Sequence, residues 1–136
     1  MRPVLFDTNA YTAFKRADAA IVEIVQHAEY IGISPIVIGE LLAGFDGGNK
    51  AKQNRIELMK FMESSRIRVY PITLDTSHFF SQIFCSLKSK GKPIPTNDMW
   101  IAAQAQEHGC VVCTFDKHFD SIEGLISGNT AADLFM

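Results

Sequence analysis

The chain has 136 residues, of which 47% are hydrophobic and 21% are charged, and its formal net charge at pH 7 is -2. This composition excludes an intrinsically disordered chain, and the length suits one domain with its own core, so we expect a single domain over residues 1–136. No apolar run approaches the roughly 18 residues of a membrane span, and the N-terminus lacks a signal-peptide pattern, so we expect a cytoplasmic protein without a membrane partner.

The chain opens on a short apolar run that stops at three polar residues. Residues 4–6 have the composition of a buried strand, and Asp7, Thr8 and Asn9 follow directly. Ligands of a parallel α/β sheet lie beyond the carboxyl ends of its strands, so Asp7 is a candidate functional residue. All three residue types are also good helix N-caps, and the tripeptide alone fits a helix start equally well.

The rest of the chain alternates between helical and strand patterns. Helices are predicted over residues 8–16, 19–27, 35–44, 50–64 and 96–108, with another running from a cap at Asp75 or Thr76 to about residue 88. Strands are predicted over residues 30–34, 67–72 and 110–115, and a short one within 122–127. This alternation predicts an α/β fold, a three-layer α/β/α sandwich with a central, mainly parallel sheet of four or five strands. The strand order does not follow from the pattern.

Three cysteines, Cys85, Cys110 and Cys113, fit a reducing compartment. Cys110 and Cys113 have the C-x-x-C spacing but lie in a predicted strand, where residues three apart point to opposite faces. We therefore expect buried structural thiols rather than a metal or redox pair.

Glu40 is the only charged residue in the apolar run that follows Ser34-Pro35, a helix-start signal. A helix that is apolar nearly all the way round should be buried. A buried carboxylate is costly unless it is paired, hydrogen-bonded or metal-bound, so Glu40 is a second candidate. The alternative is that Glu40 lies on a narrow solvent-facing stripe or meets a lysine.

Two further acids complete the candidate set. Asp98 lies in the first turn of the helix over residues 96–108, where the helix dipole alone favours an acid. Asp116 ends the predicted strand 110–115 as Asp7 ends the first one. Parallel strands present both acids at one edge of the sheet, and the Glu40 helix begins at that edge. Converging carboxylates repel one another, and a hard cation such as Mg²⁺ or Mn²⁺ relieves this repulsion; zinc is less favoured, because no His or Cys pair has suitable spacing.

Four motifs in this order, D-T-N, S-P-I-V-I-G-E-L-L-A-G, P-T-N-D and T-F-D-K-H-F, resemble the PIN domain, and more narrowly the VapC-type ribonuclease toxins of toxin–antitoxin pairs. The resemblance implies an α/β/α sandwich and a Mg²⁺- or Mn²⁺-dependent endoribonuclease that leaves a 5′-phosphate and a 3′-hydroxyl. It implies that the acids Asp7, Glu40, Asp98 and Asp116 hold one or two metals. It also implies accessory polar roles for Thr8, Asn9 and Thr114, although capping remains an equal alternative for Thr8.

RNA also requires positive charge, which a net charge of -2 neither indicates nor excludes. Lys88, Lys90 and Lys92 precede Asp98 and are the preferred phosphate contacts, and Lys117 follows Asp116 directly. The alternative is that these lysines are ordinary surface charges. His118 is a candidate general base, but the family's chemistry does not require one, and we leave it out of the site.

The resemblance also implies a homodimer and a cognate VapB-type antitoxin that covers the site. The helix over residues 76–88 is rich in apolar surface, and we expect part of it to meet a second subunit or the antitoxin; its large apolar residues are Phe79, Phe80, Ile83, Phe84 and Leu87. Alternative functions are a PIN-fold nuclease with a non-toxin RNA or DNA processing role and a catalytically silent PIN-like regulatory module. The presence of all four acids argues against the silent module.

Overall fold

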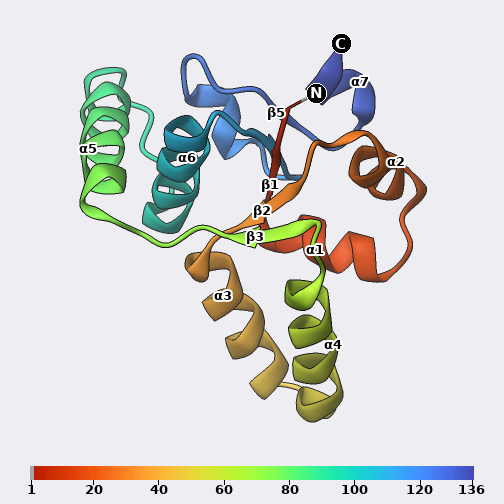
Figure 1. The fold of residues 1–136 in the computed structure, drawn as a ribbon. Helices are drawn as coiled ribbons and strands as arrows, with labels where there is room; N and C mark the ends of the chain where they lie inside the picture. Colours follow the sequence, from red (N-terminus) through yellow and green to blue (C-terminus); the bar gives the residue numbers. More distant parts are fainter. Residues whose placement is uncertain (1) are drawn as a thin grey trace.

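The computed structural model of the chain describes residues 2–136 and has a five-stranded parallel sheet at its centre (Figure 1). The strands are β1 (Val4–Phe6), β2 (Ile31–Ile33), β3 (Ile67–Val69), β4 (Val111–Cys113) and β5 (Ser127–Gly128), and they lie in the order β3-β2-β1-β4-β5. Every neighbouring pair is parallel. The predicted α/β sandwich with a central parallel sheet is therefore confirmed.

Helices cover both faces of the sheet. They are α1 (Thr8–Lys15), α2 (Ala19–His27), α3 (Pro35–Asp46), α4 (Ala51–Glu63), α5 (Leu74–Ser89), α6 (Thr96–His108) and α7 (Ala131–Phe135), with a short 3-10 helix, η1 (Lys117–Ser121). Helices α5 and α6 lie on one side of the sheet, α1, α2 and α7 lie on the other, and α3 and α4 project from the body as a hairpin (Figure 1). Within residues 2–136, no helix is both long and apolar enough to cross a membrane.

The helix starts follow local capping chemistry. Ser34 caps α3 through a hydrogen bond from the Ile36 N–H, and Pro35 is the first helical residue, as predicted. The predicted cap of α5 at Asp75 or Thr76 is wrong. Thr73 is the N-cap, and the Thr76 hydroxyl accepts a hydrogen bond of 3.0 Å from the Thr73 N–H. Thr73 and Thr76 form a capping box. The sequence did not indicate it, because a threonine takes the place of the usual glutamate or glutamine three residues after the cap.

An aromatic cluster fixes α1 and α4 against the end of β1. The Phe61 ring of α4 stacks on Phe6 at 6.2 Å and packs edge-on against Tyr11 and Phe14 of α1. Phe6 and Tyr11 are buried. This packing holds the first turn of α1, and with it the residues directly after β1, in one position.

On the other side of the sheet, Gly32 allows a close approach of the Tyr70 ring. A Cβ atom at position 32 would lie 2.5 Å from Tyr70 Cε2. Tyr70 also stacks on His108 at 3.8 Å, and its carbonyl accepts a hydrogen bond of 2.7 Å from the Gln104 side chain of α6. These contacts pack α6 tightly on the sheet and so determine where its first turn lies.

The cysteines behave as the strand pattern predicts. Cys110 and Cys113 are buried and unpaired, and Cys85 is exposed. Burial raises the pKa of the Cys113 thiol to about 12. The C-x-x-C spacing is therefore structural here.

The aromatic surface of α5 is mostly used within the chain. Phe80 stacks on Trp100 of α6 at 4.1 Å, and Ile83 and Leu87 are buried. Phe84, with 44% of its surface exposed, is the large exposed apolar side chain of this group. Less apolar surface is therefore free for a partner than the sequence indicated.

Candidate active site

The site forms where strands β1 and β4 lie side by side. Phe6 pairs with Cys113, so the two strands end level with each other. Strands β2 and β3 lie on one side of β1, and β4 and β5 lie on the other, so the order of the strands reverses between β1 and β4. In α/β sheets, ligands bind at such a switch point. The Asp7 N–H donates to the Cys113 carbonyl at 3.0 Å, and the Thr114 hydroxyl donates to Asp7 Oδ2 at 2.7 Å.

Asp7 is both a helix cap and a site residue. Its Oδ1 atom accepts a hydrogen bond of 2.8 Å from the Thr8 N–H at the start of α1. Only 6% of its surface is exposed. The two interpretations of this position are therefore compatible, because capping uses one carboxylate oxygen and Thr114 holds the other.

Glu40 lies on the exposed side of α3, and the prediction that this helix is buried is wrong. Only Val37 and Leu41 of α3 are buried, because the helix projects in the α3–α4 hairpin and packs on one side only. The Glu40 carboxylate is nevertheless held at the site. It accepts hydrogen bonds from the Thr8 hydroxyl at 2.7 Å and from the Asn97 amide at 3.3 Å.

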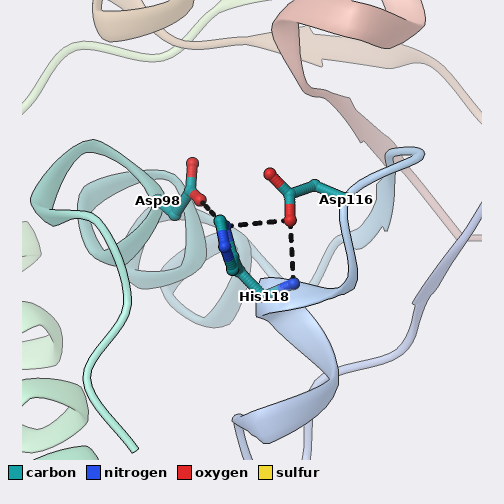
Figure 2. A group of neighbouring side chains, drawn as sticks. All are labelled: Asp98, Asp116 and His118. Carbon is teal, nitrogen blue, oxygen red and sulfur yellow. Dashed lines mark hydrogen bonds and ion pairs between the residues drawn. The ribbon is translucent and has the colours of Figure 1, made fainter.

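Asp98 and Asp116 meet through a histidine that the sequence analysis left out. His118 Nδ1 lies 2.9 Å from Asp98 Oδ2 and 2.9 Å from Asp116 Oδ1, and Figure 2 shows the ring between the two carboxylates. The backbone N–H of His118 also donates a hydrogen bond of 2.9 Å to Asp116 Oδ1, so the Asp116 side chain caps η1. His118 lies two residues after Asp116 in T-F-D-K-H-F, and this spacing was the signal available in the sequence.

One cavity of about 680 Å³ contains all four acids. Its lining residues are Asp7, Thr8, Asn9, Thr12, Ala13, Arg16, Asp18, Glu40, Asp98, Phe115 and Asp116. Arg16, directly after α1, is the only lysine or arginine among them, and the sequence analysis did not single it out. We call this space the acidic cavity.

The lysines that the sequence favoured do not border the acidic cavity. Lys90 forms an ion pair of 3.0 Å with Glu123, whose carbonyl accepts a hydrogen bond from Gln106 near the end of α6. Asp98 lies in the first turn of α6, about 12 Å along the helix from Gln106 at 1.5 Å per residue. The expected rim position is therefore wrong for Lys90, and neither Lys88 nor Lys92 lines the cavity.

The accessory residues take distinct places. Thr8 contacts Glu40 and Thr114 contacts Asp7, through the hydroxyl hydrogen bonds given above. Asn9 Oδ1 accepts a hydrogen bond of 3.2 Å from the Phe115 N–H, and so ties α1 to the segment after β4. Lys117 lines a neighbouring cavity of about 210 Å³ beside Asp116.

Burial and mutual repulsion disfavour ionised carboxylates here. Desolvation raises the pKa of Asp7 above its ordinary value, and its hydrogen bonds from Thr114 and Thr8 only partly oppose this. Desolvation also raises the pKa of Asp98, against the hydrogen bond from His118. In turn, the hydrogen bond to Asp98 raises the pKa of His118.

The donor set fits a hard divalent cation. Across residues 2–136, no lysine or arginine forms an ion pair with any of the four carboxylates. Asp98, Asp116 and His118 offer ligand atoms within 4.8 Å of one another. Mg²⁺ and Mn²⁺ prefer carboxylate oxygens, and a cation here would supply the charge that the surrounding side chains do not.

Comparison with known proteins agrees with this geometry. The sequence profile of the PIN domain matches residues 4–125. The chain is 32% identical to Ribonuclease VapC1 of Rickettsia felis over 125 residues, which cover 90% of this chain and 92% of the relative. It is also 32% identical to the VapC ribonuclease Y4jK of Sinorhizobium fredii, over 83% of this chain and 86% of the relative.

Solved structures give the same result. A DNA-bound VapBC from Salmonella typhimurium has a chain with a TM-score of 0.81 and 27% identity, matched over 93% of this chain and 97% of that one. VapBC-1 from nontypeable Haemophilus influenzae gives a TM-score of 0.80 and 25% identity, over 92% and 96%.

Proposed function

We propose a function from the premise that this chain belongs to the PIN domain family and, within it, to the VapC ribonucleases. The protein is an endoribonuclease, the toxin component of a toxin–antitoxin pair, and it hydrolyses RNA phosphodiesters with the help of a divalent cation. We treat residues 1–136 as one nuclease domain.

The convergence of Asp7, Glu40, Asp98 and Asp116 on the acidic cavity is the observation that carries this proposal. The four acids come from the end of β1, from α3, from the first turn of α6 and from the segment after β4. Such a cluster is unfavourable by itself. We propose that all four are catalytic residues and metal ligands, and that the metal is Mg²⁺ or Mn²⁺.

When bound, such a cation lowers the pKa of a coordinated water and neutralises charge on the phosphate. The side chains of this protein orient the ligands. Thr114 fixes one oxygen of Asp7, and Thr8 and Asn97 fix the two oxygens of Glu40. His118 contacts both Asp98 and Asp116 and holds these two carboxylates close together.

Two basic residues are the phosphate contacts that we propose. Arg16 borders the acidic cavity, and Lys117 borders the smaller cavity beside Asp116. An RNA strand that passes from one cavity to the other meets both side chains. Phosphate contacts of this kind supply affinity without base specificity.

The proposed partners follow from the relatives. The similar chains in solved structures come from VapBC toxin–antitoxin complexes, which supports a VapB-type antitoxin as the partner of this chain. A homodimer and a cytoplasmic location, where RNA and a reducing environment coincide, complete the proposal.

The decisive experiment is cleavage of labelled RNA by the purified protein with Mn²⁺. Asp116→Asn should lower the rate roughly 100-fold or more, because even outer partners of a metal site cost about 10- to 100-fold. Asp75→Asn is the matched control, since Asp75 is an exposed aspartate of α5 that lines neither the acidic cavity nor the smaller cavity around Lys117. Equal cleavage by the wild type and Asp116→Asn would contradict the proposal. Growth arrest on expression, relieved by the antitoxin, separates a toxin from a processing nuclease.

A further inference from the structure

Phe115 is an exposed aromatic residue in a cavity lined mostly by polar residues. Phe115 has 44% of its surface exposed. Among the large exposed apolar side chains of residues 2–136, only Phe115 lines the acidic cavity. Single exposed apolar residues are ordinary on a protein surface. The position of this one, between the site residues Thr114 and Asp116, is the reason to assign it a role.

The backbone around Phe115 is held on both sides. Its N–H donates to Asn9 Oδ1 at 3.2 Å, and the next N–H, that of Asp116, donates to the Thr114 hydroxyl at 2.9 Å. Thr114 is in turn bound to Asp7. The hydrogen bonds that arrange the acids therefore also hold the backbone from which the Phe115 ring projects. Binding at this ring then costs little ordering of the backbone.

Phe115 lies between two cavities. It lines the acidic cavity of about 680 Å³ and the smaller one of about 210 Å³ that contains Lys117. A strand whose phosphodiester sits among the acids and which continues toward Lys117 must pass this ring. The group carried by each nucleotide at that point is a base with an aromatic face.

We infer that Phe115 is a stacking residue for one unpaired nucleobase of the RNA, next to the phosphodiester that is cut. This inference rests on the proposed ribonuclease function and adds a substrate subsite to it. A phenylalanine ring offers no hydrogen-bonding group, so the subsite accepts any base by its π-face and selects single-stranded RNA over paired RNA.

Four variants test the subsite by cleavage of a labelled 12-nucleotide single-stranded RNA with Mn²⁺. Phe115→Ala should lower kcat/KM roughly 10- to 100-fold, which is the usual effect of losing one base–aromatic stack. Phe115→Tyr should keep most of the activity, and Phe115→Leu should not, because leucine is apolar but not aromatic. Ile126→Ala is the control, since Ile126 is similarly exposed, at 41%, and lines neither cavity.

The same RNA with one abasic nucleotide, placed in turn at each position, locates the base. The wild type should be slowed at a position beside the cut, and Phe115→Ala should show no further loss there. Full activity of Phe115→Ala or Phe115→Leu would overturn the inference, as would a Phe115→Ala variant that cleaves normally but escapes inhibition by a protein partner. If the wild type cleaves no RNA, the proposed function itself fails; if the wild type cleaves and Asp116→Asn does not, only the stacking subsite is in question.

Discussion

Thr114 and Asp7 are separated by 107 positions in the sequence and joined by a hydrogen bond of 2.7 Å in the structure. Both side chains are buried, with exposed fractions of 2% and 6%. The bond exists because β1 and β4 pair in parallel register and end together. This hydrogen bond fixes the orientation of the Asp7 carboxylate. Burial raises the pKa of that carboxylate above its ordinary value.

Thr114→Val should destabilise the metal-free protein at neutral pH. Valine has nearly the same shape but cannot donate to the buried Asp7 oxygen, and an unsatisfied buried acceptor costs about 1–3 kcal/mol. Urea denaturation measures the change in the free energy of unfolding. Thr114→Ser keeps the hydroxyl and serves as the control, so equal stabilities of the valine and serine variants would contradict the role of the bond.

Asp7→Asn should raise the melting temperature of the metal-free protein at pH 7. The pKa of Asp7 in the folded protein lies above its ordinary value, so the folded state binds this proton more tightly than the unfolded chain. The ionised side chain therefore costs stability at pH values above the raised pKa, and this cost disappears as the pH falls toward the ordinary aspartate pKa of about 3.9. Thermal melts in EDTA from pH 4 to pH 8 should show the advantage of the variant shrinking as the pH falls. A difference that does not change with pH would contradict the raised pKa.

Mn²⁺ or Mg²⁺ should stabilise the folded protein by mass action. At a free concentration 100 times the Kd the gain is about 2.7 kcal/mol, which corresponds to a rise of roughly 10 °C in melting temperature for a domain of this size. The Asp116→Asn variant should lose most of this rise, and Asp75→Asn should keep it. A flat melting temperature at millimolar metal would show that the acidic cavity does not hold a cation.

Gly32→Ala and Gly39→Ala should change stability in opposite directions. The added methyl group at position 32 would lie 2.5 Å from the Tyr70 ring, and overpacking of this kind costs about 1–3 kcal/mol. Gly39 lies inside α3 with nothing within 4 Å of an added Cβ atom, so alanine there should stabilise by about 0.5–1 kcal/mol. Chemical denaturation of both variants gives the two signs, and a neutral Gly32→Ala would contradict the close packing of Tyr70.

Local sequence patterns were sufficient to predict the parallel sheet and the acids that follow β1 and β4. The apolar runs stop at Asp7 and shortly before Asp116, and the parallel alternation of strands and helices brings such ends to one edge. The fold class and the shared location of the four acids in one cavity were therefore predictable. The predicted boundaries of β2, β3 and β4 were too long, because regular pairing covers only three residues of each strand, and β5 begins at the last residue of its predicted range. Helix α7 was not predicted because its five residues have too short a pattern.

The sequence by itself determined which acids stand at strand and helix ends, since those positions depend on short-range patterns of apolar and polar residues. Only the tertiary structure decided their environment. Glu40 is exposed because α3 projects from the body, and His118 bridges Asp98 and Asp116 because η1 turns back toward α6. Arg16 borders the acidic cavity. Lys90 instead forms an ion pair with Glu123, which is hydrogen-bonded to Gln106 near the C-terminal end of α6. These contacts join segments distant in sequence, and their energies depend on packing between elements, which no local pattern contains.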